Sequence, residues 1–234
     1  MFEVRDISFA YDKDKVLNGV NFSVAPSSPV AIVGANGAGK TTLLKILAGL
    51  ACPLAGSAFL DNRNVSINTI RYRKQLGYMP EKIALSDDMK VREYLIYRAV
   101  IKGEVPRRAT RRVDEVLKLC SLSDFSRKYA GDLSAGLKKM ISLADAILLK
   151  PRILLIDDPY SGLDVASRNL ATDILSTYAQ NSSVIVTGHE IEELSKWVDS
   201  FLVLEKGAIS KAVSAGEDRS ALGLMVRKVL EGGE

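Results

Sequence analysis

The sequence is poor in the residues that build disulfide frameworks and zinc sites. Among 234 residues there are two cysteines and one histidine, and Cys52 and Cys120 lie far apart with no Cys-x-x-Cys or Cys/His spacing. Disulfide scaffolds and structural zinc sites need several such residues at short spacing. Their scarcity argues against both and agrees with a reducing compartment such as the cytosol.

Long apolar runs are also missing. The N-terminus carries charged side chains from Glu3 onward and has no apolar segment of the signal-peptide kind. The most apolar stretch, residues 140–156, is interrupted by Asp145, Lys150 and Arg152. A membrane-spanning helix needs about 20 mainly apolar residues. We therefore expect any membrane role to depend on a partner.

Charge of one sign does not dominate, since the formal net charge is only +4. The densest basic cluster comprises Arg107, Arg108, Arg111 and Arg112 and has no interleaved aromatic residues, which argues against nucleic acid as a partner. A solvated helix face is the simplest interpretation of this cluster, and contact with anionic lipid or a protein is the alternative.

The spacing of apolar residues predicts an α/β fold. Apolar and polar residues alternate over residues 2–24 around a polar turn, as in two antiparallel strands. Helical spacing dominates residues 87–149, and a last helix is expected near residues 217–230. Short apolar segments predict further strands at residues 30–33, 57–60, 76–79, 153–156, 184–186 and 201–204.

Strands that alternate with helices indicate a mostly parallel sheet, here with an N-terminal antiparallel β portion and a helical insertion. We expect one domain over residues 1–234. Its core and β portion would span about residues 1–84 and 151–234, and its helical insertion about residues 85–150.

Residues 34–41 match the phosphate-loop pattern G-x-x-x-x-G-K-[ST] between a predicted strand and a predicted helix. Glycines let such a loop curl so that successive backbone N–H groups face a phosphate, and the helix N-terminus adds its positive dipole end. Lys40 should reach the β- and γ-phosphates and Thr41 should ligate Mg²⁺. The nucleotide-binding residues predicted here are Gly34, Ala35, Asn36, Gly37, Ala38, Gly39, Lys40, Thr41 and Thr42.

Asp157 ends the apolar segment that begins at Ile153. Alone it would be interpreted as an acidic turn, but with a phosphate loop upstream it becomes a predicted Mg²⁺ ligand, since hard cations prefer oxygen ligands. Loop and carboxylate together predict a P-loop NTPase with a RecA-like core.

Four further segments narrow the class by resemblance. Residues 133–138, Leu-Ser-Ala-Gly-Leu-Lys, resemble the LSGGQ signature of ABC ATPases, and residues 161–164 resemble their D-loop. His189 ends a predicted strand as their switch histidine does, and Tyr11 stands where they stack an aromatic ring on adenine. The sequence thus resembles the ATP-binding subunits of ABC transporters over nearly its whole length. It is most similar to export-type members, in which Glu81 has a counterpart where many importers carry Gln.

The resemblance implies ATP and Mg²⁺ as cofactors and catalytic roles for Glu81, Asp158 and His189, with Glu81 also near Mg²⁺. It places Tyr11 and Val16 at the adenine. It also implies that one group of residues binds nucleotide held by a second subunit in a head-to-tail dimer. This group is Ser134, Ala135, Gly136, Leu137 and Asp164.

The implied partners are a second ATP-binding subunit, expected to be identical, and a membrane-spanning subunit that would hold the chain at the cytoplasmic face of the membrane. Without the resemblance, Tyr11 would be interpreted as a core residue, His189 as a structural group and Ser134 as a helix N-cap.

Two departures from the family pattern concern catalysis. Asp158 stands where the family has Glu and is shorter by about 1.5 Å, one C–C bond. Ala135 and Leu137 replace a Gly and a Gln of the signature. Slow hydrolysis is therefore expected, and a catalytically weak regulatory subunit is one alternative. A non-transport ABC ATPase is another, although the chain has no long coiled-coil insertion and no second cassette.

A cleft between the core and the helical insertion is the expected docking place for a helix of the membrane subunit. The alternative is that its residues simply pack the insertion. The candidates for lining it are Ile83, Leu85, Met89, Tyr94 and Tyr97.

Overall fold

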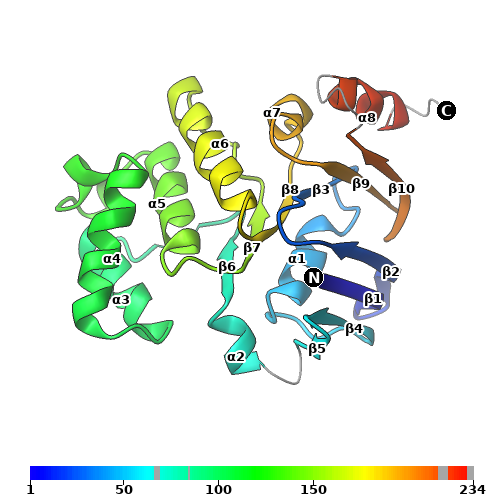
Figure 1. The fold of residues 1–234 in the computed structure, drawn as a ribbon, viewed down its shortest axis with the longest axis horizontal. Helices are drawn as coiled ribbons and strands as arrows, with labels where there is room; N and C mark the ends of the chain where they lie inside the picture. The colour runs from blue at the N-terminus through cyan, green and yellow to red at the C-terminus, as the bar shows by residue number, and fades with distance from the viewer. Residues whose placement is uncertain (66–68, 84, 216–220, 231–234) are drawn as a thin grey trace.

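Two β-sheets with helices packed around them make up the fold, in a computed structural model that describes residues 1–65, 69–83, 85–215 and 221–230 (Figure 1). The smaller sheet is antiparallel, with strand order β2-β1-β4-β5. Its strands are β1 (Phe2–Tyr11), β2 (Asp14–Val24), β4 (Ala55–Leu60) and β5 (Arg63–Asn64).

The larger sheet has the order β10-β9-β3-β8-β7-β6. Neighbouring strands from β6 to β9 are parallel, and β10 runs antiparallel to β9. The predicted α/β fold with a mostly parallel sheet and an antiparallel β portion is therefore confirmed. The strands are β3 (Val30–Val33), β6 (Leu76–Met79), β7 (Ile153–Asp157), β8 (Ser183–Thr187), β9 (Ser200–Glu205) and β10 (Ala208–Ser214).

The larger sheet is buried on both faces. In β7, Ile153 and Leu155 join one apolar cluster while Leu154 and Ile156 join the other. The first cluster also contains α1 (Lys40–Leu47), which lies between the two sheets (Figure 1). Helices α5 (Ala135–Ile147), α6 (Val165–Ala179), α7 (Ile191–Ser195) and α8 (Leu222–Leu230) contribute to the second cluster.

Helices α3 (Val91–Ile101) and α4 (Pro106–Leu119) extend the second cluster beyond the sheet. Helix α4 begins with Pro106, which is favourable in a first helical turn because that turn's N–H groups have no intrahelical partner. Its arginines lie on the solvent side, where Arg111 and Arg112 form ion pairs with Glu115. This is the arrangement expected of a solvated helix face.

Among the elements not expected from the sequence are β5, β10, the short helix α2 (Thr69–Arg73) and the 3-10 helices at Ser123–Phe125 and Ala130–Asp132. The predicted C-terminal helix corresponds to α8, and residues 217–220 of that prediction lie outside the described residues. Tyr94 is only 8% exposed, so the prediction that it lines an open cleft is wrong: it packs in the core. In the described part of the chain, no helix combines the length and apolarity needed to cross a membrane.

Candidate functional site

A cavity of about 350 Å³ lies where β3, β6, β7 and β8 end. Ligands of open parallel sheets bind at this edge, because loops after neighbouring strands converge there. All residues that line the cavity, except Thr187 and Gly188, were predicted from the sequence. The described lining residues are Tyr11, Val16, Asn36, Gly37, Gly39, Lys40, Thr41, Thr42, Glu81, Asp157, Asp158, Thr187, Gly188 and His189.

The loop after β3 needs glycine at its two ends. A Cβ on Gly34 would lie 2.2 Å from the Leu204 carbonyl oxygen, and Gly39, the N-cap of α1, has a φ of 105° that favours glycine. No side chain caps α1. Because the first N–H groups of a helix have no intrahelical acceptor, the start of α1 is suited to bind an anion.

Lys40 is held against this loop. Its Nζ donates to the carbonyl oxygens of Gly34 (2.7 Å) and Ala35 (3.0 Å). Burial lowers the pKa of Lys40, while the nearby carboxylates of Asp157 and Asp158 act in the opposite direction. The two loop residues Ala35 and Ala38 do not line the cavity, and Ala38 packs against the apolar cluster around α1.

Asp157 is 3% exposed and faces the loop from the end of β7. Thr187 Oγ1 donates to Asp157 Oδ1 at 2.5 Å, whereas Asp157 Oδ2 is buried with no partner among the described residues. An unpartnered buried carboxylate oxygen near Thr41 fits a hard cation.

The described residues contain no group of three His, Cys, Asp or Glu side chains that could hold a metal alone. Magnesium in such sites is ordinarily bound by one or two carboxylates together with substrate phosphates, so this donor set fits a magnesium–nucleotide complex.

Asp158 has a left-handed backbone, with a φ of 52°. Its N–H donates to the Thr187 carbonyl oxygen at 2.9 Å, and its Oδ1 is buried without a partner among the described residues. Burial raises the pKa of Asp158, and the neighbouring Glu190 raises it further, while Lys139 lowers it. The result is a carboxylate with an acceptor oxygen available beside the phosphate loop.

Sequence reasoning missed Lys139 and Glu190 as members of this cluster. Lys139, on α5, is 4% exposed, and its pKa is lowered by burial while the carboxylates of Asp158, Glu81, Asp157 and Glu190 oppose that shift. The signal available was a lysine within a helix whose buried positions are mostly apolar, with Ser142 and Asp145 as the other polar ones. Glu190 has a buried, unpartnered Oε2 among the described residues, and nothing in the local sequence distinguishes it from the following glutamates.

At the other end of the cavity, the β1–β2 hairpin supplies Tyr11 and Val16. Tyr11 is 50% exposed and packs edge-on against Phe9, with ring centroids 4.8 Å apart. One face of the Tyr11 ring can therefore take a flat aromatic group, because stacking needs only an accessible π-face.

The residues predicted to act across a dimer do not line this cavity. Ser134 caps α5 by accepting from the Leu137 N–H at 3.3 Å, and Asp164 caps α6 by accepting from the Ser167 N–H at 2.7 Å, which lowers the pKa of Asp164. A Cβ on Gly136 would lie 3.1 Å from the Gly162 carbonyl oxygen, so the two segments lie side by side. Ser134, Ala135 and Asp164 are exposed, and Gly136 and Leu137 are partly buried.

A phosphate loop at the start of a helix, facing a buried aspartate at the end of a parallel strand, defines a P-loop nucleotide-binding protein. Comparison with known families narrows this class. The profile of the ABC transporter family matches residues 17–161, and the chain belongs to that family.

Individual relatives agree with this assignment. The chain is 34% identical over 206 residues to the Nod factor export ATP-binding protein I of Burkholderia orbicola (strain AU 1054), covering 88% of this chain and 68% of that protein. It is 31% identical over 214 residues to an uncharacterized ABC transporter ATP-binding protein of Methanocaldococcus jannaschii, covering 89% and 84% of the two chains.

Solved structures share the fold over nearly the whole chain. An ATP binding subunit of an ABC transporter matches with a TM-score of 0.85 at 26% identity, covering 100% of this chain and 95% of the other. A dimeric ATP-binding cassette in a post-hydrolysis state, bound to ADP and Pi, matches with a TM-score of 0.84 at 22% identity, covering 92% and 100%.

Proposed function

We propose that this chain binds and hydrolyses MgATP and thereby drives export through a separate membrane subunit. The observation that carries the proposal is one cavity in which Lys40 and Thr41 of the phosphate loop meet the unpartnered Oδ2 of Asp157. Membership of the ABC transporter family supports nucleotide binding, and the name of the Burkholderia relative supports export.

In this proposal ATP extends along the cavity. Tyr11 and Val16 take the adenine, and the N–H groups at the start of α1 take the phosphates together with Lys40, whose Nζ turns from the loop carbonyls to the β- and γ-phosphate oxygens. Thr41 and Asp157, with Glu81 nearby, would hold Mg²⁺, which neutralises charge on the phosphate oxygens when bound.

Asp158 would orient the attacking water through its unpartnered Oδ1 and accept the proton that the water loses. His189 is exposed at the end of β8 and would contact the γ-phosphate. The shorter aspartate side chain places its carboxylate about 1.5 Å further back than a glutamate would. Displacements near 1 Å can cost about 100-fold in rate, so we expect slow hydrolysis.

A second subunit would complete the site. The exposed Ser134 and Asp164 segments lie side by side outside the cavity, next to Val165, whose side chain is 75% exposed. In a head-to-tail dimer these segments would face the nucleotide bound by the other copy, so that each site contains residues of both subunits.

The membrane subunit would dock on the helical part of the molecule. Tyr97, Val100 and Ile101 recur at helical spacing on α3 and are 53%, 40% and 53% exposed. Val105, the N-cap of α4, is 51% exposed. An apolar stripe of this kind suits an amphipathic helix of a partner. Leu85 and Met89 pack partly against the core instead, so the proposed docking surface shifts to this stripe. The chain would then lie at the cytoplasmic face of the membrane through its partner.

Steady-state ATPase measurements on variants of Asp158 test the catalytic proposal. Wild type should hydrolyse ATP slowly, and Asp158→Glu should raise kcat by about ten- to 100-fold because it restores the reach of the carboxylate. Asp158→Asn should bind ATP and accumulate as a nucleotide-bound dimer. An unchanged kcat in Asp158→Glu together with rapid wild-type turnover would show that the length of the carboxylate does not limit the rate.

A second candidate function follows from the same residue. If wild type binds ATP but hydrolyses it only when paired with a different cassette, the chain is a regulatory subunit, and the short Asp158 is the observation that favours this. Mixing experiments with a competent homologous subunit would distinguish the two functions.

A further inference from the structure

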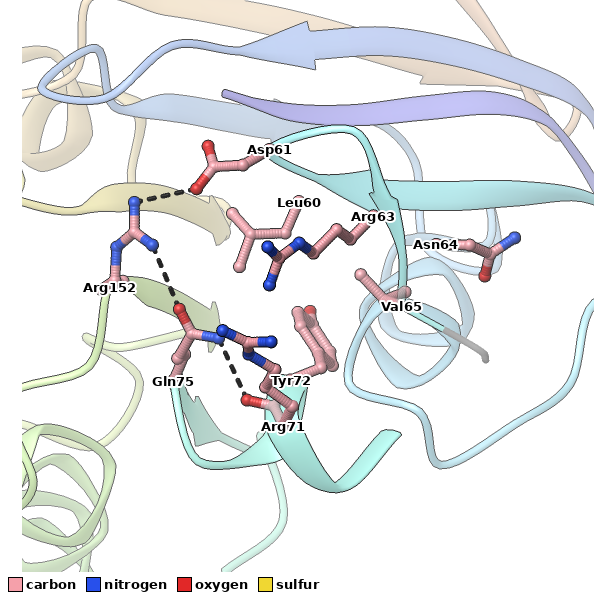
Figure 2. A pocket seen from close by; sticks show the side chains of 9 residues that line it. All are labelled: Leu60, Asp61, Arg63, Asn64, Val65, Arg71, Tyr72, Gln75 and Arg152. Atoms are coloured by element: carbon pink, nitrogen blue, oxygen red, sulfur yellow. Dashed lines mark hydrogen bonds and ion pairs between the residues drawn. The ribbon is translucent and has the colours of Figure 1, made fainter. Parts of the chain in front are cut away.

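A second cavity, of about 280 Å³, lies at the opposite edge of the larger sheet (Figure 2). Gln75 and Arg152 directly precede β6 and β7, whereas the nucleotide cavity lies beyond the other ends of these strands. Strands of this length span roughly 13–17 Å, so the two cavities are separate. The described residues lining the second cavity are Leu60, Asp61, Arg63, Asn64, Val65, Arg71, Tyr72, Gln75 and Arg152.

The floor of this cavity is apolar. Leu60, Val65 and Tyr72 are buried, with 8%, 5% and 3% of their surfaces exposed. The Tyr72 hydroxyl donates to the Leu47 carbonyl oxygen at 2.6 Å, so the tyrosine offers its ring and not its hydroxyl to the cavity. A ligand could rest its organic part here.

Along one wall of the cavity, the polar side chains already bond to one another. Arg152 donates to Asp61 Oδ2 at 3.0 Å and to Gln75 Oε1 at 3.2 Å (Figure 2). The other oxygen of Asp61 accepts from the N-terminal ammonium of Met1 at 2.9 Å. The only carboxylate among the described lining residues is therefore engaged with two cations.

The two remaining arginines of the lining, Arg63 and Arg71, differ from Arg152 in their bonding. Figure 2 shows Arg63, from β5, and Arg71, from α2, extending into the same space. Neither guanidinium has a hydrogen bond or an ion pair with another described residue. Three arginines against one aspartate give the described lining a net charge of +2. Like charges that share a hollow repel one another unless an anion lies between them.

We propose that this cavity is a binding site for a small phosphorylated molecule, with the phosphate between Arg63 and Arg71 and the organic part on the apolar floor. Guanidinium groups present paired N–H donors that match the spacing of phosphate oxygens, which makes arginine the preferred residue for this task. The site is distinct from the nucleotide cavity, and the proposal does not depend on ATP hydrolysis.

Isothermal titration with inorganic pyrophosphate tests the proposal in the full chain. Excess MgADP keeps the probe out of the phosphate loop, and MgADP binding measured first in every variant verifies that each is folded. Wild type should bind pyrophosphate, and Arg63→Gln with Arg71→Gln should bind it at least about ten-fold more weakly because two charge-assisted hydrogen-bond donors are lost.

The matched control removes the same charge elsewhere. Arg107→Gln with Arg108→Gln, on the exposed face of α4, should leave pyrophosphate affinity within about two-fold of wild type. Neither residue lines the cavity, and salt screens exposed charges that do not contact the ligand. If both double variants lose pyrophosphate affinity equally, the proposed site does not exist and wild type binds the probe through general charge attraction.

The phosphate could belong to a free molecule or to a lipid headgroup. Sedimentation with phosphatidylcholine vesicles, with and without phosphatidic acid, separates the two sources. Binding to the acidic vesicles that depends on Arg63 and Arg71 identifies a headgroup, and pyrophosphate binding without vesicle binding identifies a free ligand. Absence of both kinds of binding overturns the proposal.

Discussion

Asp145 offers a quantitative test of how α3 is held against α5. Its carboxylate is 8% exposed and accepts from Arg98 at 2.9 and 3.0 Å and from Lys102 at 2.7 Å, while Lys102 Nζ also donates to the Asp145 carbonyl oxygen at 2.6 Å. Both cations belong to the end of α3, and Asp145 lies on α5. The substitution Asp145→Asn keeps the shape of the side chain and removes its charge.

The magnitude follows from burial. Removing one partner of a fully buried ion pair costs about 3–5 kcal/mol, because the other charge is left uncompensated. Here Arg98 and Lys102 are 33% and 21% exposed, so water relieves part of that cost. We expect a loss of about 2 kcal/mol in the free energy of unfolding. For a chain of this length that corresponds to a melting temperature lower by about 4–8 °C.

Urea denaturation followed by circular dichroism measures this loss, and its pH dependence adds a second readout. Burial already lowers the pKa of Lys102 from its ordinary value of 10.5, and Asp145 opposes that shift. Without Asp145 the pKa falls further. A lysine whose pKa is lower in the folded state destabilises it while protonated, and this cost disappears as pH rises through the folded pKa. The deficit of Asp145→Asn should therefore shrink as pH rises toward 10.5, the ordinary pKa of lysine.

Asp114 is the matched control. It accepts from the Arg92 guanidinium at 2.9 and 3.2 Å, much as Asp145 does from Arg98, but the side chains of Arg92 and Asp114 are 38% and 50% exposed. Asp114→Asn should cost at most about 1 kcal/mol. Equal losses in the two variants, or a deficit of Asp145→Asn that grows with pH, would refute the argument from burial.

Three further predictions concern the nucleotide cavity. Asp158→Asn should increase the free energy of unfolding of the nucleotide-free protein at neutral pH by about 1 kcal/mol, because it removes a charge with a buried, unpartnered oxygen. The pKa of Asp158 is raised in the folded protein, so this gain should shrink as pH falls and vanish below pH 3.8, the ordinary pKa of aspartate. Thermal melts at neutral pH and below pH 3.8 measure the change. Tyr11→Ala should weaken ATP and GTP binding alike by about 1–3 kcal/mol in titration calorimetry, since either base can stack; loss for one nucleotide only would indicate hydrogen-bond recognition of the base. Gly34→Ala should prevent nucleotide binding or folding because its Cβ would lie 2.2 Å from the Leu204 carbonyl oxygen, whereas Gly37→Ala meets open space and should cost only about 1–2 kcal/mol of backbone strain, as denaturation curves can show.

The nucleotide cavity was predictable because its parts are local in sequence. A phosphate loop and a strand-terminal aspartate each have a short pattern, and parallel strands bring their carboxyl ends to one edge. His189 was added by the resemblance to ABC ATPases. The strands at residues 30–33 and 76–79 were likewise predicted with their observed bounds, since each is a compact apolar run.

Other features depend on contacts that no local pattern contains. Asp145 meets Arg98 across 47 positions of sequence, and Lys139 approaches the carboxylates only because α5 packs beside the strands that carry them. Strand β10 was missed because its residues are mostly partly or fully exposed, as on a sheet edge, and lack a buried run. Such elements are determined by the packing of the whole chain, which overrides weak local preference.

The two-sided burial of β7 bears on how the sheet finds its alignment during folding. A strand with one polar face resists slipping by one residue, because a slip would turn its apolar side chains toward water. All five residues of β7 are buried, and Ile153 to Ile156 are apolar without interruption, so a slipped pairing would cost little along that run. Polarity returns only at its two ends, with Arg152 paired to Asp61 and Asp157 bonded to Thr187. We therefore expect these end contacts to favour the observed register, and substitution of Asp157 to favour misaligned pairing during refolding as well as weaken the proposed magnesium site.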